Sequence, residues 1–337
     1  MRSFAYSVPS SVAEAVAAIG AAGPGAKFLA GGTTLYDLMK LGVERPQAVV
    51  DVSRLAELDY IDTSGTTELV FGAGARMADV ADDPVLRRDY PALSESLWRA
   101  ASAQLRNMAT VGGNLLQRTR CTYFRGGPAY PCNKRSPGSG CAARGGDDRG
   151  LAVLGTSDAC IATSPGDWPV ALLAFDASID VAGPGGERTV PLADLYLEPG
   201  GTPQREHTLA PDELILRIRV PVTPAGRGST FLKIRDRESY AFALASAAVG
   251  LTLSAAGNVA ECRVALGGLA TRPWRAEAAE QALAGGQLTA EQARRAGQAA
   301  LAGARPGARN AFKIELGIRT VAHALRIAGE RAAHAAS

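Results

Sequence analysis

Several features that define large protein classes are scarce or missing in this sequence. Histidine occurs three times in 337 residues, and the formal net charge is only +3. A near-balanced charge gives no reason to expect binding to nucleic acid or to a charged membrane surface. The first residues include neither a twin-arginine pair nor an apolar run, so we expect no export signal on this chain.

Long apolar runs are also missing. An uncharged stretch at residues 239–260 is rich in alanine, glycine and serine, and Gly250 and Gly257 interrupt it. This composition predicts strand–turn–strand rather than a spanning helix, and we expect no membrane insertion.

Cysteine is present, but not at zinc-finger spacing. Four of the five cysteines fall between residues 121 and 160, separated by 10, 8 and 18 residues, and no pair forms Cys-x-x-Cys. Disulfide frameworks are typical of short secreted chains, so this clustering favours metal binding. The four clustered cysteines are Cys121, Cys132, Cys141 and Cys160.

Three interpretations of this cluster remain open. Four thiolates suit zinc or an iron–sulfur cluster, and the third interpretation is a solvated basic loop with inert cysteines. Nearby cations would offset the negative charge of a cluster and raise its potential; they are Arg120, Arg125, Lys134, Arg135 and Arg144. Cys262 lies in a predicted strand and is expected to pack as a small residue. The histidines, His207, His323 and His334, are distant in sequence.

The N-terminal region predicts a small β-α-β unit over residues 1–53. A helix at 12–19 can start at Ser10 or Ser11, and strands at 27–29 and 48–52 flank a helix at 35–41. The glycine-rich turn before that helix exposes N–H groups that suit a pyrophosphate, although glycines that merely make a tight turn explain it equally well.

Beyond residue 53, apolar residues recur at the spacings typical of strands and helices. The glycines at 72–74 resemble a dinucleotide fingerprint, but Met77 replaces the third glycine, so we reject a Rossmann interpretation. Composition changes at 221–228, which predicts a domain boundary. The remaining predicted helices are 77–81, 91–101, 169–175, 275–283, 289–301 and 312–330, and the remaining strands are 178–181, 189–192, 213–221, 229–235, 243–253 and 259–266.

Five motifs, taken in order, resemble the FAD-binding medium subunits of molybdenum hydroxylases. They are Leu29–Leu35 (LAGGTTL), Ala109–Leu115 (ATVGGNL), Asp167–Leu173 (DWPVALL), Phe231–Lys233 with Arg237, and Ala265–Pro273 (ALGGLATRP). Most members pass from the second motif to the third through a short connection, whereas here residues 115–166 intervene and contain the cysteines. That departure resembles the subgroup with an extra [4Fe–4S] cluster, closest to the flavin subunit of periplasmic aldehyde oxidoreductases.

The resemblance implies an α+β fold. A two-subdomain FAD-binding fold of the vanillyl-alcohol-oxidase (PCMH) type would precede a C-terminal domain with a three-stranded antiparallel sheet and a three-helix layer. The implied domains are residues 1–55, residues 56–222 with the cysteine-rich insertion at about 117–162, and residues 223–333. Because other members lack the insertion, we expect the flavin fold not to depend on it.

Site residues follow from the same resemblance. FAD would be contacted by Leu29, Ala30, Gly31, Gly32, Thr33, Thr34 and Leu35, by Thr110, Gly112, Gly113 and Asn114, and by Asp167, Ile215 and Lys233. The four clustered cysteines would hold the [4Fe–4S] cluster. No catalytic residue is predicted on this chain.

The implied function is electron transfer within a molybdenum-dependent aldehyde oxidoreductase. A large subunit with the molybdenum cofactor and a small [2Fe–2S] subunit would complete a heterotrimer, or a dimer of heterotrimers, that delivers electrons to an external acceptor. The location would be cytoplasmic, or periplasmic if a partner carries the export signal. Alternatives are a 4-hydroxybenzoyl-CoA reductase-like or xanthine dehydrogenase-like flavin subunit, a stand-alone flavin oxidase, and a zinc-stapled interaction subunit. With no histidine near the motifs, the oxidase lacks a candidate base.

Overall fold

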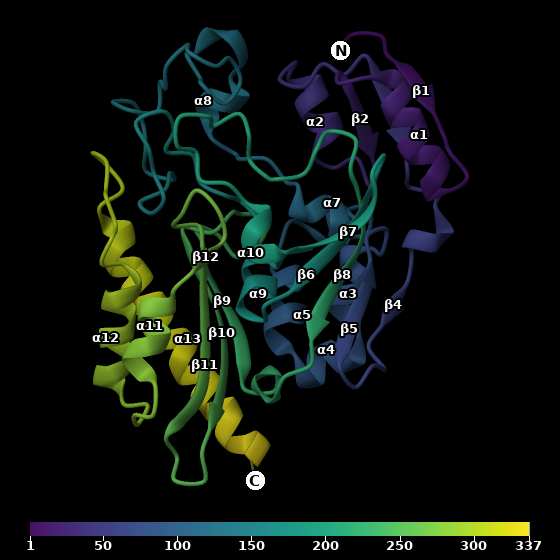
Figure 1. Cartoon of the computed structure of the whole chain (residues 1–337). Coiled ribbons are helices and arrows are strands. Elements are labelled where there is room, and N and C mark those ends of the chain that lie inside the picture. Colours follow the sequence, from purple (N-terminus) through teal and green to yellow (C-terminus); the bar gives the residue numbers. More distant parts are fainter. Residues whose placement is uncertain (337) are drawn as a thin grey trace.

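A computed structural model describes residues 1–336 and contains three sheets (Figure 1). The first sheet is parallel, in the order β1 (Ala5–Ser7), β3 (Ala48–Asp51), β2 (Ala26–Leu29), and is packed by α1 (Val12–Ala22). Ser11 caps α1 by accepting a hydrogen bond from the Glu14 N–H. The chain then passes through the glycine turn into α2 (Leu35–Lys40). The predicted β-α-β unit is confirmed, and β1 is an additional strand that sequence patterns did not predict.

The second sheet has five antiparallel strands around β8. Their order is β4 (Ile61–Asp62), β5 (Glu68–Gly72), β8 (Leu214–Pro221), β6 (Ser178–Gly183) and β7 (Gly186–Pro191). Because β5 lies between two antiparallel neighbours, the rejection of a Rossmann motif at residues 69–77 is correct. The accompanying helices are α3 (Met77–Asp82), α4 (Pro84–Asp89), α5 (Pro91–Trp98), α6 (Ala103–Arg106), α7 (Val111–Leu115), α9 (Trp168–Ala174) and α10 (Leu192–Leu195).

A register shift in β8 places neighbouring residues of this strand in two different hydrophobic cores. Arg217 pairs with Asp180 and Ile215 with Val181, so Leu216 is left over between them. The strict alternation of apolar side chains between the two faces of a strand, which was expected for residues 213–221, is therefore interrupted. Leu216 packs with the first sheet, whereas Ile215 packs in the larger core beneath the second sheet.

The third sheet carries the C-terminal helices. Its order is β12 (Trp274–Arg275), β11 (Val259–Gly267), β10 (Ala245–Leu253) and β9 (Ser229–Ile234), all antiparallel. The sheet thus has a fourth, two-residue strand beyond the three predicted. The helices are α11 (Glu277–Leu283), α12 (Ala290–Ala300) and α13 (Phe312–Ala336), and α13 packs along β10 and β9.

Residues 239–260 contain all of β10, a turn and the start of β11, as predicted. Within residues 1–336, no helix has the length and apolar character needed to cross a membrane.

The cysteine insertion, residues 117–162, is mostly irregular. It contains α8 (Thr122–Arg125) and the short turn η2 (Gly127–Ala129). Figure 1 shows it beside the end of the third sheet and facing α2. Its own small core contains Cys121, Cys132 and Cys160 with Phe124, Ile161 and Leu38 of α2, and Cys141 is partly buried against it. Two further single turns, η1 (Ala56–Leu58) and η3 (Pro224–Gly226), complete the described elements.

Candidate cofactor sites

The two glycine motifs of the predicted flavin site touch through their backbones. A Cβ atom added at Gly31 would lie 2.0 Å from the carbonyl oxygen of Met108, directly before the second motif. Gly32 adopts a positive φ of 73°, which glycine tolerates best. The structure therefore brings together two segments that are about eighty residues apart, and only a side chain without Cβ allows that approach.

The second motif forms α7 rather than a plain loop. Thr110 caps this helix, since its Oγ1 accepts a hydrogen bond from the Gly113 N–H at 3.2 Å. A Cβ at Gly112 would lie 2.6 Å from the Cβ of Ala73, so Gly112 packs against the turn after β5. A bulky substitution at Gly112 would disturb that packing whether or not a phosphate lies nearby.

One polar atom without a partner lies among the predicted flavin residues. The Oδ1 atom of Asn114 is buried and accepts no hydrogen bond within the described chain. Buried polar atoms are rarely left unpaired, so this atom suits contact with a polar ligand. The glycine-lined junction and this oxygen fit the residue set expected for FAD.

Asp167 and Lys233 form a buried ion pair. Lys233 Nζ lies 2.6 Å from Asp167 Oδ2, and the two side chains are 1% and 6% exposed. The same ammonium donates to the carbonyl oxygen of Arg99 at 3.1 Å. Burial raises the pKa of Asp167, and the charge of Lys233 opposes that shift. The pair joins the residue before α9 to β9, which ties the second sheet region to the third sheet.

The remaining predicted flavin residues lie on two elements. Residues 29–35 connect β2 to α2 and are all half-buried, whereas Ile215 on β8 is buried in the core that contains α7. The structure therefore gathers both glycine motifs and Ile215 around α7 and the adjoining strand ends.

The four clustered cysteines surround one cavity. Cys121, Cys132, Cys141 and Cys160 all line one space, together with Tyr123 and Phe124. Cys132 and Cys141 also form a backbone bridge. Cys262 lies on β11 in a separate core, as predicted. In the described part of the chain, no three or more His, Cys, Asp or Glu side chains are arranged to hold a single metal ion.

Burial raises the pKa of the Cys160 thiol to about 11, and the nearby Lys134 ammonium opposes this shift. Burial also raises the pKa of the Cys121 thiol. Both shifts favour the neutral thiol over the thiolate. A metal centre that binds them as thiolates would overcome that preference.

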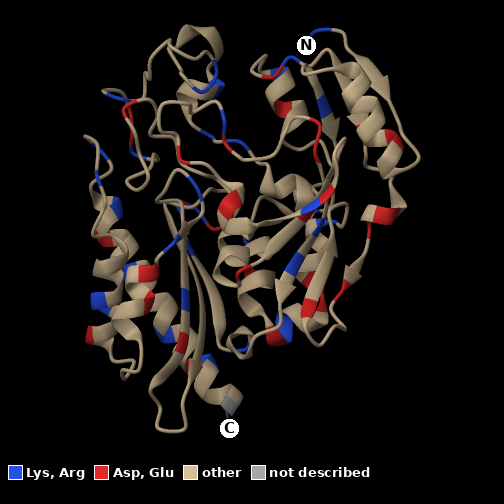
Figure 2. Cartoon of the chain, viewed as in Figure 1, with Lys and Arg blue, Asp and Glu red and all other residues tan. Residues whose placement is uncertain are grey.

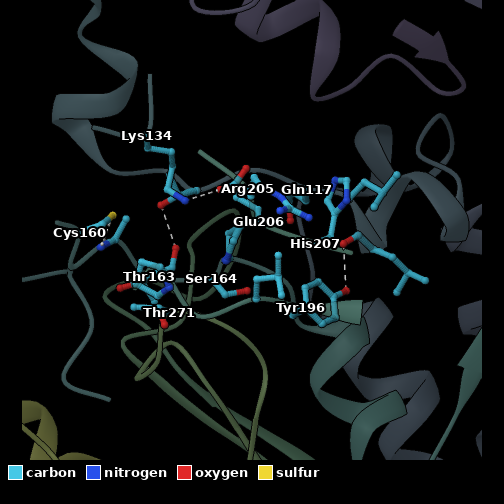
Figure 3. Close-up of a pocket in the computed structure, with 17 residues that line it drawn as sticks. Gln117, Lys134, Cys160, Thr163, Ser164, Tyr196, Arg205, Glu206, His207 and Thr271 are labelled. Atoms are coloured by element: carbon cyan, nitrogen blue, oxygen red, sulfur yellow. Dashed lines mark hydrogen bonds and ion pairs between the residues drawn. The ribbon is translucent and has the colours of Figure 1, made fainter. Parts of the chain in front are cut away.

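A second cavity joins the flavin motif to the cysteine insertion (Figure 3). Its lining includes Leu115, Gln117, Tyr196, His207 and Cys160. Tyr196 donates a hydrogen bond to the Leu115 carbonyl oxygen at 2.9 Å, and burial raises the pKa of its hydroxyl.

The expectation that no histidine lies near the flavin motifs is wrong for His207, although His207 is distant from the cysteines in sequence. It lines the second cavity with Cys160, and its Nδ1 atom is buried without a hydrogen-bond partner. Burial lowers the pKa of this imidazole. Sequence reasoning missed His207 because the contact depends on the folding of the loop at 196–207, and no local spacing links it to the cysteines.

Ion pairs attach the start of the insertion to two other regions. Arg118 pairs with Glu44, which follows α2, and with Glu206 at 2.5 Å. Arg120 and Arg125 both pair with Asp37 of α2, at 3.1 and 2.8 Å. These contacts connect the insertion to the first sheet region and to the loop that carries His207.

The end of the insertion is clamped to the C-terminal helices. Asp148, which is buried, accepts hydrogen bonds from the N–H groups of Ala308 and Arg309, each at 2.8 Å. Lys313 of α13 is fully buried and donates to the carbonyl oxygens of Leu151 and Gly268, at 2.8 and 2.6 Å. The expectation that the flavin fold does not depend on the insertion took no account of these contacts.

Comparison with known proteins gives a consistent classification. Residues 2–223 match the FAD binding domain in molybdopterin dehydrogenase, and residues 230–328 match the CO dehydrogenase flavoprotein C-terminal domain. The chain therefore belongs to the FAD-binding medium subunits of molybdenum hydroxylases, and so is an oxidoreductase subunit.

Individual relatives cover nearly the whole chain. The aldehyde oxidoreductase FAD-binding subunit PaoB of Escherichia coli K12 is 46% identical over 326 residues, which are 96% of this chain and 98% of PaoB. The carbon monoxide dehydrogenase medium chain of Hydrogenophaga pseudoflava is 31% identical over 300 residues, 89% of this chain and 86% of that one. A solved structure of carbon monoxide dehydrogenase from the same organism has a TM-score of 0.76 at 30% identity and covers 98% of both chains. The predicted fold class is confirmed.

Proposed function

We propose that this chain is the FAD- and [4Fe–4S]-carrying electron-transfer subunit of a molybdenum-dependent aldehyde oxidoreductase. Electrons from a large molybdenum-cofactor subunit would reach FAD here through the [2Fe–2S] centres of a small subunit, and then pass to an external acceptor. The aldehyde assignment is supported by the 46% identity to PaoB over almost the full length of both chains.

The observation that carries the cluster assignment is the four-cysteine cavity. All four cysteines of the insertion line it, whereas Cys262 packs elsewhere. A [4Fe–4S] cluster is larger than a single ion, so its ligands must surround a space instead of meeting at Zn–S distances of about 2.3 Å. Four thiols that line one cavity support the cluster assignment.

The chain's contribution at the flavin site would be binding and orientation. FAD, when bound, supplies reversible two-electron chemistry. We propose that residues 29–35 and 110–114 enclose its diphosphate, that Asn114 offers its free Oδ1 to a polar group of the ligand, and that Ile215 forms an apolar wall. Lys233 is proposed to approach the flavin while Asp167 fixes the position of its ammonium.

The partners are proposed from the relatives. A subunit that depends permanently on others normally buries at least ~2,000 Å² of surface in its interfaces. We expect the native protein to purify with a large molybdenum-containing chain and a small iron–sulfur chain. A stable lone monomer with full aldehyde-oxidising activity would contradict the proposed role.

Iron and sulfide analysis tests the cluster. The wild-type subunit should hold about four iron and four sulfide, and single Cys→Ser changes at positions 121, 132, 141 and 160 should lower both. Cys262→Ser is the matched control, because it removes a buried thiol from a different core. Retained iron in all four variants, or loss of iron in Cys262→Ser alone, would refute the ligand set.

A stand-alone flavin oxidase remains the second candidate because of one observation. The structure places His207, with a free Nδ1 atom, in the cavity beside the flavin motif. This supplies the base that the oxidase interpretation lacked. Family membership favours the electron-transfer role, and aldehyde oxidation by the isolated chain would decide for the oxidase. His207→Gln should then abolish that activity, whereas under the electron-transfer proposal the isolated chain has none to lose.

A further inference from the structure

Lys134 occupies the wall between the two cavities. Among the residues that the structure describes, only Lys134, Cys160 and Ala162 line both the cysteine cavity and the cavity beside the flavin motif. The Lys134 side chain is 9% exposed, so its charge is largely shielded from solvent. Figure 3 shows Lys134 and Cys160 at the end of the second cavity away from Tyr196 and His207.

Fixed partners hold the Lys134 ammonium in place. Its Nζ atom lies 2.9 Å from Glu206 Oε1 and donates to the Pro203 carbonyl oxygen at 2.8 Å. Glu206 is held in turn by Arg118, and although burial raises its pKa, Arg118 and Lys134 together lower it below the usual value. Lys134 and Glu206 therefore form a charged pair of fixed position next to Cys160.

The other basic residues of the insertion are directed elsewhere. Arg120 and Arg125 pair with Asp37, and Arg135 donates to backbone carbonyl oxygens of Tyr123 and Phe124. Arg144 is about half exposed, at 47%, and pairs with the fully exposed Asp158. Lys134 is the basic residue that lines both cavities together with Cys160. Figure 2 shows that basic residues are spread along the insertion, yet their contacts distinguish Lys134 from the rest.

We infer that Lys134 sets the electrostatic potential at the Cys160 side of the cluster site, and that Glu206 limits its effect. This inference rests on the proposed function, since it concerns the cluster that the four cysteines would hold. Reduction of a cluster adds one electron and breaks no bond at the ligands. A fixed, shielded cation beside a ligand sulfur stabilises the added negative charge and so raises the midpoint potential.

Two variants of opposite sign test the inference. Lys134→Gln should lower the midpoint potential of the cluster in an EPR-monitored redox titration of the intact complex, because the cation is removed. Glu206→Gln should raise it, because the opposing charge is removed while Lys134 stays. Lys134→Arg should restore a value near that of the wild type, and Arg144→Gln, which removes an exposed cation, should cause a clearly smaller shift.

The outcomes separate this inference from the proposed function. Wild-type protein without iron would refute the cluster itself. Full iron content with unchanged potentials in Lys134→Gln and Glu206→Gln would overturn the role of Lys134 and leave the cluster assignment intact. If Lys134→Gln loses iron, the Glu206→Gln titration decides: a raised potential supports the inference, and an unchanged one overturns it.

Discussion

The flavin region and the cysteine insertion are built by different means. In the flavin region, two glycine motifs meet through backbone atoms, and an apolar core surrounds α7. The insertion has little regular structure and is held by charged side chains, including Arg118, Asp148 and Lys313. Close packing fixes the conformation of the flavin region, whereas a few hydrogen bonds and ion pairs fix the position of the insertion. Substitutions should therefore destabilise the two regions through different interactions.

The largest expected effect is from removing the insertion. Replacing residues 118–163 by a short linker removes two of the three carbonyl acceptors of Lys313 and also removes Asp148. Hydrogen bonds that involve charged groups contribute about 1.5–3 kcal/mol each, so loss of the Lys313 and Asp148 contacts together should cost more than about 5 kcal/mol in urea unfolding. Adding Lys313→Met should recover part of the loss. Unchanged stability of the deletion variant would show that the clamp contributes nothing.

The next largest effect is expected at the buried pair of the flavin region. Asp167→Asn leaves the Lys233 ammonium buried without its counter-charge, which should lower the free energy of unfolding by about 3–5 kcal/mol. The double variant Asp167→Asn/Lys233→Met should regain much of that stability while its FAD content stays low. Glu291→Gln, which breaks an exposed helical pair with Arg295, is the control and should change stability by less than about 1 kcal/mol. Equal effects at both sites would mean that burial of the pair is unimportant.

A smaller effect is expected where the glycine motifs touch. Gly31→Ala places a Cβ against the Met108 carbonyl oxygen, and overpacking of this kind costs about 1–3 kcal/mol. FAD content, measured by absorbance after desalting, should fall with it. Gly20→Ala is the matched control, because Gly20 lies inside α1 with no atom within 4 Å of the added Cβ. That change should stabilise the chain by about 0.5–1 kcal/mol.

The smallest effect concerns the pH dependence of the clamp. Burial lowers the pKa of Lys313 from 10.5 to about 8. Between these values the unfolded chain binds more protons than the folded one, so stability should rise with pH across this window. Relative to Lys313→Met, the wild type should gain stability as pH increases through it. Parallel stability curves for the two proteins would show that the lysine keeps an ordinary pKa.

Sequence patterns predicted the flavin region better than the insertion. Glycine spacing, strand alternation and helix caps are local signals, so the β-α-β unit around Gly31 and the cap at Ser11 were predictable. The register shift at Leu216 was not, because a bulge depends on the neighbouring strand. It also placed Ile215, rather than Leu216, in the core with α7.

The contacts of the insertion could not be predicted from its composition. Arg118 reaches Glu44 across 74 residues and Asp148 reaches Ala308 across 160, and no sequence spacing relates such partners. The cysteines were predictable as a group because thiols are rare and were clustered. The position of His207 was not, since it depends on the loop that Glu206 anchors.

Because residues 148–151 contact residues 308–313, these two distant segments of the chain must be transferred together in any chimera. Residues 148–151 supply the acceptor groups, and residues 308–313 supply the donors that meet them. A chimera that combines the insertion of this chain with the C-terminal segment of another subunit would lack these contacts. Asp148 would then be buried without its hydrogen-bond partners. An engineer who moves the cysteine site into a related subunit must therefore move the start of α13 along with it.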